Sequence, residues 1–359
     1  MRHFAFTLLT LSLLLGSFGL IAADQPAARP NPPVHLSNVP VPPERLAAFH
    51  PLPPAMEDRA YPMTAARVAL GRMLYYDPRL SASQKVSCNT CHPLDKYGVD
   101  NEAVSTGVKG QHGARNAPTV YNSAGHASQF WDGRAATVEE QAKGPMMNPV
   151  EMGMDSQARV VVTVGSIWEY RDLFRKAFPG HRHPISFENV AVAIGAFERG
   201  LVTPSRWDRF LRGDRTALTD EEIAGFNTFY EVGCATCHNG TYLGGEKYEK
   251  LGALKPWPDT HDPGRFEVTR READRAVFKI AGLRNVAMTA PYYHDGSVAT
   301  LPEAIRMMGE YQLGRKLDAA QIGSIETYLK ALTGQIPSGY VSPPPLPPSR
   351  HDTPRPITD

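Results

Sequence analysis

The stretches Cys88-Asn89-Thr90-Cys91-His92 and Cys234-Ala235-Thr236-Cys237-His238 repeat one pattern, C-x-x-C-H. This pattern is the attachment sequence of a c-type haem, in which two thiols bond to the vinyl groups of the porphyrin. The histidine that follows becomes the proximal ligand of the iron. The sequence therefore predicts two covalently bound haem c groups, with His92 and His238 as iron ligands.

Paired cysteines have three other common uses: a zinc ribbon, a thioredoxin-like dithiol and a pair of disulfides. A zinc ribbon needs no histidine directly after each CxxC, and a redox dithiol needs no second copy. The four cysteines of the two motifs are all the cysteines of the chain, so none is left for a structural disulfide elsewhere. The pattern favours haem, and with it redox chemistry.

The composition permits two domains and excludes some partners. A chain of 359 residues is long enough for two domains of ordinary size. Its net charge of +1 gives no reason to expect nucleic acid or an anionic membrane surface as a partner. The 32 prolines and 30 glycines indicate much irregular chain between the elements.

The N-terminus has the pattern of a secretory signal peptide, residues 1–23. Arg2 and His3 precede an apolar run from Phe4 to Ile21, which the small residues Ala22-Ala23 close. This order predicts cleavage after Ala23 and export to the periplasm. An uncleaved anchor is the alternative, since the run is nearly long enough to span a bilayer.

Both ends of the mature chain are rich in proline. Residues 24–60 are predicted to form an extended arm or linker that contributes nothing to a core. The tail, residues 337–359, has two interpretations: a solvated tail, or a strap that lies on the globule or on a second subunit.

The sequence between these ends predicts two similar helical halves, residues 61–203 and 204–336, with a boundary near Thr203-Pro204-Ser205. In each half a helix precedes CxxCH. Thr64 is a plausible N-cap in the first half. In the second, Thr219 and Glu222 form a capping box, and Gly233 is predicted to end the helix.

A second helix closes each half. Apolar residues recur at helical spacing in both segments: Val190, Ile194, Phe197 and Leu201, then Ile322, Ile325, Leu329 and Leu332, with Gly334 as the predicted stop. The loops over residues 107–125 and 240–264 are long enough to wall haem pockets. The expected fold is mainly α, with two cytochrome c-like haem domains.

Several further motifs, in order, resemble those of the bacterial dihaem cytochrome c peroxidases. The similarity covers nearly the whole folded region and rests on these stretches: Leu70-Gly71 through Asp77-Pro78-Arg79-Leu80-Ser81, Arg115-Asn116-Ala117-Pro118-Thr119, Gln129-Phe130-Trp131-Asp132-Gly133-Arg134-Ala135, Leu283-Arg284-Asn285-Val286, Thr289-Ala290-Pro291-Tyr292-Tyr293-His294-Asp295-Gly296 and Met308-Gly309.

The resemblance implies a peroxidase with two haem domains facing each other. Hydrogen peroxide would bind at an open iron on the haem of His92. Electrons would enter one at a time through the haem of His238, from a small monohaem cytochrome c or a cupredoxin. The resemblance also implies a homodimer.

A peroxidase needs an acid/base group beside the open iron, because peroxide must lose a proton from one oxygen and gain one on the other. Burial lets a carboxylate do both, since it raises the pKa. By resemblance, Glu151 is the catalytic glutamate and Gln141 the glutamine that hydrogen-bonds the ligand. Glu139 and Glu140 are interpreted as residues of a solvated face.

By the same resemblance, Met308 is the sixth ligand of the second haem iron, although sequence alone barely separates it from Met307. A thioether ligand raises the reduction potential, which suits an electron-accepting haem. Trp131 matches a tryptophan between the haems, and a simple buried aromatic at the domain interface is its other interpretation.

A calcium ion is also implied, held by Asn116 and the carbonyl groups of Thr289 and Pro291, with waters completing the shell. The sequence departs from the family at Val108. Many members have a histidine there that blocks the open iron until the other haem is reduced. Valine cannot ligate iron, and His112 and His126 are either replacements or ordinary loop histidines.

Two other functions compete with the peroxidase. One is a dihaem oxidase that acts on residues of a partner protein. The related oxidase has a tyrosine as haem ligand where this chain has Met308, and Tyr311 lies nearby in sequence. The other is an electron carrier in which both irons are fully ligated. Binding of cyanide or azide to the oxidised protein separates a carrier from an enzyme, because a carrier has no vacant iron.

Overall fold

The computed structural model describes Met1 and residues 39–357. The predicted signal peptide and the first part of the Pro-rich arm fall outside the described residues. The contacts within the chain group residues 35–359 into one unit. No helix among the described residues is long and apolar enough to cross a membrane.

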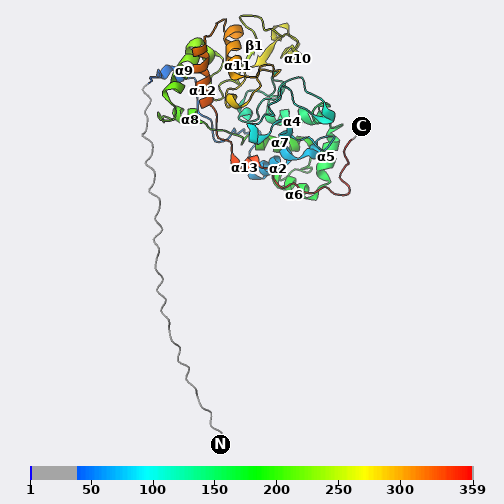
Figure 1. The fold of residues 1–359 in the computed structure, drawn as a ribbon. Helices are drawn as coiled ribbons and strands as arrows, with labels where there is room; N and C mark the ends of the chain where they lie inside the picture. The colour runs from blue at the N-terminus through cyan, green and yellow to red at the C-terminus, as the bar shows by residue number, and fades with distance from the viewer. Residues whose placement is uncertain (2–38, 358–359) are drawn as a thin grey trace. The chain divides into compact units, whose positions relative to one another are not determined.

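Helices and irregular segments make up most of this unit, which confirms the prediction of a mainly α fold (Figure 1). The strands β1 (Tyr248–Lys250) and β2 (Val277–Lys279) form one short antiparallel pair, with Glu249 opposite Phe278. The α-helices are α1 (Pro43–Leu46), α2 (Ala65–Tyr76), α3 (Cys88–Cys91), α4 (Val138–Met147), α5 (Gln157–Gly165), α6 (Trp168–Ala177), α7 (Phe187–Glu198), α8 (Arg206–Leu211), α9 (Asp220–Val232), α10 (Phe266–Thr269), α11 (Leu301–Met307), α12 (Ala319–Ala331) and α13 (Ser338–Val341).

Three of the four helix ends predicted from capping residues are confirmed, and one is wrong. The Thr64 hydroxyl accepts a hydrogen bond from the Arg67 amide at 3.2 Å, and Thr219 and Glu222 form the predicted capping box of α9. Gly233 ends α9 at φ 105°, a left-handed conformation that favours glycine. The prediction for Gly334 is wrong: α12 ends at Ala331, and the Gly334 amide instead donates to the Asn285 side chain.

In each half the helix before CxxCH packs against the closing helix, α2 against α7 and α9 against α12 (Figure 1). A glycine permits the close approach in both pairs. A Cβ on Gly71 would overlap the carbonyl oxygen of Ala193, and a Cβ on Gly225 would overlap that of Ser324. The two halves therefore build their helix pairs by the same device.

Replacing Gly225 by alanine should destabilise the protein, because the new methyl group forces α9 and α12 apart. We expect a loss of about 1–3 kcal/mol, the usual cost of overpacking. Gly323→Ala in α12 is the matched control, since no atom lies within 4 Å of its Cβ position. That change should stabilise by about 0.5–1 kcal/mol, since alanine is the better helix former. Urea unfolding of the holoprotein measures both, and equal effects would contradict the role of close approach.

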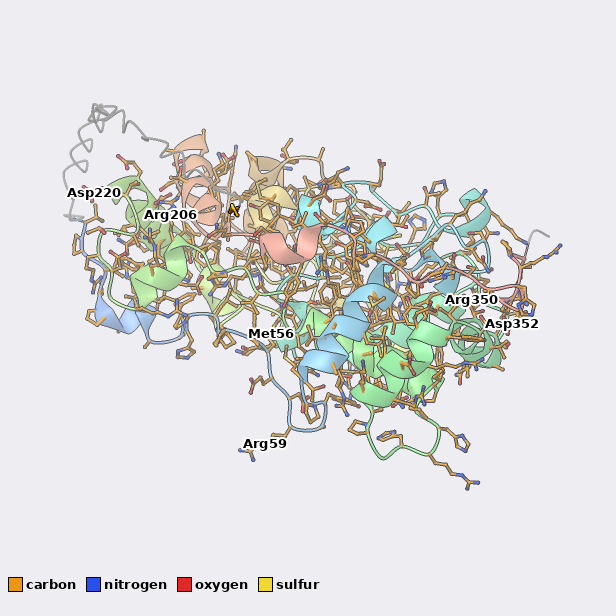
Figure 2. The ribbon with its side chains drawn as sticks, turned by 90° about the horizontal axis from the view of Figure 1, so that it is seen from below. Met56, Arg59, Arg206, Asp220, Arg350 and Asp352 are labelled. Atoms are coloured by element: carbon orange, nitrogen blue, oxygen red, sulfur yellow. The ribbon has the colours of Figure 1, made fainter. Side chains whose placement is uncertain are left out.

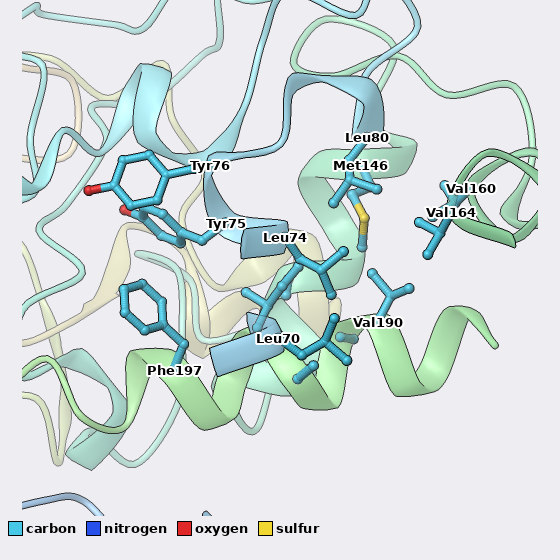
Figure 3. Close-up of a cluster of buried hydrophobic side chains, with 14 of the residues drawn as sticks. Leu70, Leu74, Tyr75, Tyr76, Leu80, Met146, Val160, Val164, Val190 and Phe197 are labelled. Carbon is cyan, nitrogen blue, oxygen red and sulfur yellow. The ribbon is translucent and has the colours of Figure 1, made fainter. Parts of the chain in front are cut away.

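The buried apolar residues form two main clusters, one from each half. The first is built mainly by α2, α5, α6 and α7, and Figure 3 shows Leu70, Leu74, Val190 and Phe197 within it. The second is built mainly by α8, α9, α11 and α12 around Trp207 and Phe226. The chain passes from one cluster to the other between Leu201 and Trp207.

A turn motif occurs once in each half. Gln129 pairs with Ala135 across one turn and Tyr292 with Val298 across the other, and each pair has an N–H···O bond of 2.7 Å. Phe130 and Tyr293, the second residues of the two turns, both have positive φ. The motif places Trp131 and His294 at equivalent positions.

The end of the Pro-rich arm is part of the core, so the prediction that residues 24–60 contribute nothing to it is wrong for this part. Phe49, Leu52 and Met56 are buried, with 4%, 2% and 4% of their surface exposed. Phe49 packs edge-on against Trp207 and Phe226. Figure 2 shows Met56 among other side chains and Arg59 on the outside.

The C-terminal tail lies along the first half as a strap, and the solvated-tail interpretation is wrong for its described residues. Arg79 donates to the carbonyl oxygen of Pro347 at 2.8 Å, and the Ile357 amide donates to that of Ala82 at 2.8 Å. Arg350, labelled in Figure 2, pairs with Glu169. Hydrogen bonds to backbone atoms explain why a proline-rich segment can be held without an apolar pattern.

Candidate haem sites and peroxide pocket

The two motif histidines have the same hydrogen-bond arrangement. Nδ1 of His92 lies 3.2 Å from the Gly98 carbonyl oxygen, and Nδ1 of His238 lies 3.2 Å from that of Leu243. A carbonyl acceptor places the proton on Nδ1 and leaves Nε2 free to bind a metal. Burial lowers the pKa of both rings, which favours the neutral form that ligates iron.

Each motif opens into a cavity. The first, here the His92 cavity, is lined by Cys91 and His92 together with residues of both halves. The second, the His238 cavity, is lined by Cys234, Cys237 and His238 and by an apolar wall that includes Phe229, Leu283, Ile305, Ile325 and Leu329. None of the four cysteines is in a disulfide. The His238 cavity, with two thiols, a neutral imidazole and an apolar wall, fits a covalently attached haem, and the His92 cavity offers Cys91 and His92 in a more polar lining.

Glu151 lies in the turn after α4 and lines the His92 cavity. Burial raises the pKa of its carboxyl group, against smaller lowering effects of the Arg134 charge and of a hydrogen bond from Asn148. That hydrogen bond, from Asn148 Nδ2 to Glu151 Oε1, is 2.7 Å long. The carboxyl group is therefore held in place and shifted toward the protonated form, as an acid/base group requires.

Gln141 lines the same cavity from the middle of α4. Val138, Pro145 and Asn148 line it too, at a spacing of three to four residues, so one face of the helix forms a wall. Thr137 caps this helix by accepting from the Glu140 amide. The structure thus brings Gln141, Glu151 and His92 to one cavity from three separate segments.

Trp131 lines both cavities. Its indole Nε1 donates to the Asn116 carbonyl oxygen at 2.9 Å, and its own carbonyl oxygen accepts from the Lys279 amide at 2.7 Å. The indole nitrogen and the backbone of Trp131 are therefore each held by a hydrogen bond, in a residue that both cavities share.

Met308 lines the His238 cavity, and Met307 is not among its lining residues. Met308 begins a π-helical turn, Met308–Gln312, at the end of α11. Such turns are frequent at functional sites. Tyr311 is not among the lining residues either; its ring packs on Trp257 with 5.2 Å between centroids.

The three residues of the implied calcium site, Asn116, Thr289 and Pro291, all line the His92 cavity. Asn116 donates through Nδ2 to the carbonyl oxygens of Glu102 and Ala103, which leaves its side-chain oxygen for a cation. No cluster of three or more His, Cys, Asp or Glu ligands occurs among the described residues. Any cation here would rely on neutral oxygens and water.

The Val108 side chain is buried with 3% exposed and is not among the lining residues of the His92 cavity. Its amide donates to the Glu151 carbonyl oxygen at 2.8 Å, which ties this loop to the turn that contains Glu151. His112 is exposed, with Nδ1 3.3 Å from the Thr106 hydroxyl, as an ordinary loop histidine would be. His126 lines the cavity, and burial lowers its pKa well below the usual range.

The interpretation of Glu139 as a solvated residue is wrong, whereas Glu140 is exposed as expected. Glu139 is fully buried and forms two hydrogen bonds with Arg199, of 2.7 and 2.9 Å. Beside it, Glu198 lines the His92 cavity, and burial and the Glu139 charge raise its pKa to about 8.

Three residues that line the His92 cavity, Glu198, Lys279 and His294, were not predicted from the sequence. His294 had an available signal, because its Asp-Gly turn repeats the Asp-Gly turn after Trp131. Glu198 and Lys279 had none, since a charged residue inside an apolar stretch does not show which way it faces.

The fold and the two sites define a c-type cytochrome with two haems, one of them beside a buried carboxyl group. A family model described as di-haem cytochrome c peroxidase matches residues 65–216. Cytochrome c551 peroxidase of Pseudomonas aeruginosa is 46% identical over 317 residues, which cover 86% of this chain and 90% of that protein. The protein of the same name from Nitrosomonas europaea is 45% identical, with 86% and 91% covered. The chain belongs to the dihaem cytochrome c peroxidase family.

Other relatives have different names. The methylamine utilization protein MauG of Methylorubrum extorquens is 37% identical and covers 68% of each chain. The crystal structure of a MauG-like protein associated with microbial copper homeostasis has a TM-score of 0.72 and 31% identity, and covers 82% of this chain and 97% of that one. The diheme peroxidase BthA of Burkholderia thailandensis, at 20% identity, a TM-score of 0.66 and coverage of 80% and 92%, shares the fold.

Proposed function

We propose that the protein is a periplasmic peroxidase that reduces hydrogen peroxide to water, with the reaction in the His92 cavity. One observation carries this proposal: Glu151 and Gln141, from separate segments, line the same cavity as the imidazole of His92. The family assignment and the similarity to two cytochrome c551 peroxidases support it. When bound, the haem of His92 supplies an iron that takes peroxide and delivers electrons to it.

The protein contributes proton transfer and orientation to this reaction. The Glu151 carboxylate takes the proton from the peroxide oxygen nearer the iron, and the carboxylic acid so formed returns it to the oxygen that leaves as water. Asn148 holds Glu151 Oε1 and keeps the group oriented. The Gln141 amide orients the peroxide by hydrogen bonding.

We assign the electron-accepting side to the His238 cavity, with Met308 as the sixth ligand and Trp131 as the residue between the two haems. Each apolar cluster then forms the core of one haem domain, the first mainly from residues 61–203 and the second mainly from 204–336 with Phe49 of the arm. The donor is a small monohaem cytochrome c or a cupredoxin. Stopped-flow measurement of peroxide consumption by the reduced holoprotein tests the whole assignment.

Met308→Leu should lower the potential of the second haem and weaken electron entry from a high-potential donor, because the thioether stabilises the ferrous form. Met307→Leu is the control, since Met307 does not line the His238 cavity. A spectroelectrochemical titration of the two variants measures the effect. A shift with Met307→Leu alone would move the ligand to Met307.

Three further parts of the proposal rest on resemblance and on the signal pattern of residues 1–23. We propose export to the periplasm after cleavage of that segment, a calcium ion at Asn116, Thr289 and Pro291, and a homodimer. Loss of the activity on chelation and recovery with added calcium test the ion, and sedimentation tests the dimer.

A second candidate function is the oxidation of residues on a partner protein, which the resemblance implies for a dihaem oxidase of the same family; the methylamine utilization protein MauG is among the relatives of this chain. The ligand of the second haem separates the two functions. Met308 lines the His238 cavity whereas Tyr311 packs on Trp257, an arrangement that favours the peroxidase. An electron paramagnetic resonance spectrum of the oxidised protein reports the ligation of each iron. It also tests the carrier alternative, in which both irons are fully ligated.

A further inference from the structure

Lys279 is a half-buried lysine at the end of β2 that lines both cavities. Phe278 and Ile280, its neighbours in the chain, line the His238 cavity only, whereas Lys279 and Ala281 also line the His92 cavity. Because successive side chains of an extended chain point to opposite sides, the Lys279 side chain is directed toward the His92 cavity.

The ammonium group of Lys279 has polar neighbours but no carboxylate. Nζ donates to the Ser128 carbonyl oxygen at 2.7 Å and lies 3.4 Å from His126 Nδ1. Burial of the amine lowers the pKa of Lys279 to about 8, and the Asp132 charge opposes this only in part. Lys279 forms no ion pair with any described residue.

The other strong cations that line the His92 cavity, Arg115 and Arg134, are already paired. Arg115 binds Asp132 at 2.5 Å and Asp262 at 2.6 Å. Arg134 binds Asp132 at 2.9 Å and lies over the Phe130 ring. Asp132 therefore shares its charge between two arginines, and the charge of Lys279 is left without a matching anion.

A buried ammonium group without an anion is costly, whereas one beside a carboxylate is stable. A haem carries two carboxylate side chains and thus supplies the anion that this position lacks. We propose that Lys279 pairs with a carboxylate of the haem held by His92, and that its charge raises the reduction potential of that haem. A positive charge near the iron favours the reduced form, which carries one positive charge fewer.

Lys279→Gln tests the pairing, because glutamine removes the positive charge and still carries an N–H donor. The one-electron equilibrium of the His92 haem should shift about tenfold toward the oxidised form, a fall of about 59 mV in its potential. Lys279→Arg, which keeps the charge, should restore most of the potential. The exposed Lys176 in α6 provides the control, Lys176→Gln, which should leave the potential unchanged.

Spectroelectrochemical titration of the purified holoproteins gives the potential of each haem separately. An unchanged His92 haem in Lys279→Gln, a fall confined to the His238 haem, or an equal fall in Lys176→Gln would each overturn the pairing. If Lys279→Gln attaches no haem, the Lys279→Arg variant decides. A role for the charge requires Lys279→Arg to bind haem and keep its potential, and failure of this variant as well contradicts the proposal. The test is independent of peroxide turnover, so it stands apart from the proposed function.

Discussion

Glu151→Gln is expected to keep both haems and to lose about 10²- to 10⁴-fold in peroxide turnover, the range that one acid/base group contributes. The carboxamide preserves the shape of the side chain and an oxygen that accepts the Asn148 hydrogen bond, so the catalytic turn should stay folded. It cannot accept a proton from peroxide and return it. Steady-state kinetics with a reduced small cytochrome c as donor measures the loss.

A matched control is Glu140→Gln, which removes a carboxylate from the exposed side of α4 where it pairs with Lys143. This variant should turn over at the rate of the unaltered protein. Turnover by Glu151→Gln close to that of Glu140→Gln would place the acid/base role on another residue of the His92 cavity, with Glu198 as the first candidate.

The pH dependence of turnover provides a second readout for Glu151. Burial raises the pKa of its carboxyl group, so the carboxylate that accepts the peroxide proton forms at higher pH than in an exposed glutamate. The rate should therefore fall as the pH is lowered through this raised pKa. The residual rate of Glu151→Gln should lack that acid limb, which a purely structural effect of the substitution would leave in place.

The local part of the fold could be predicted from the sequence because its determinants are local. The C-x-x-C-H motifs, the Thr64 cap and the Thr219–Glu222 capping box all act within a few residues of the structure that they specify. The stop at Gly334 was wrong because that amide bonds to Asn285, 49 positions away. Burial of Phe49 likewise depends on Trp207 and Phe226.

The candidate site could be predicted only as far as the resemblance reached. The motifs predict Glu151 and Gln141, and both line the His92 cavity. Glu139 lies in the same helix as Glu140 and has the same charge, yet it is buried against Arg199. The direction of each side chain from α4 depends on what packs against the helix, and that information is absent from a short stretch of sequence.

Whether the oxidised protein must be reduced before it reacts with peroxide should depend on Val108. The resemblance implies that family members with a histidine at this position are blocked when oxidised, and that the loop opens when the other haem is reduced. A block of this kind needs two arrangements of the loop whose balance shifts with reduction. Val108 cannot ligate iron, and its loop is already fixed to the catalytic turn by the hydrogen bond to the Glu151 carbonyl group. The oxidised protein should therefore react with peroxide without prior reduction.

Val108→His should restore the block. Val108 is 3% exposed and packs closely on Gly153, so we expect the larger histidine ring to leave this buried site for the iron. Oxidised Val108→His should then be low-spin at both haems and inactive until reduced, whereas the unaltered protein should contain one high-spin haem.

The competing hypothesis is that His112 ligates the iron of the oxidised protein, although its side chain is exposed and hydrogen-bonded to Thr106. If the unaltered oxidised protein contains only low-spin iron, and His112→Ala converts one haem to high spin, then His112 blocks the iron and the loop opens on reduction after all. Electron paramagnetic resonance of the three oxidised proteins distinguishes these results.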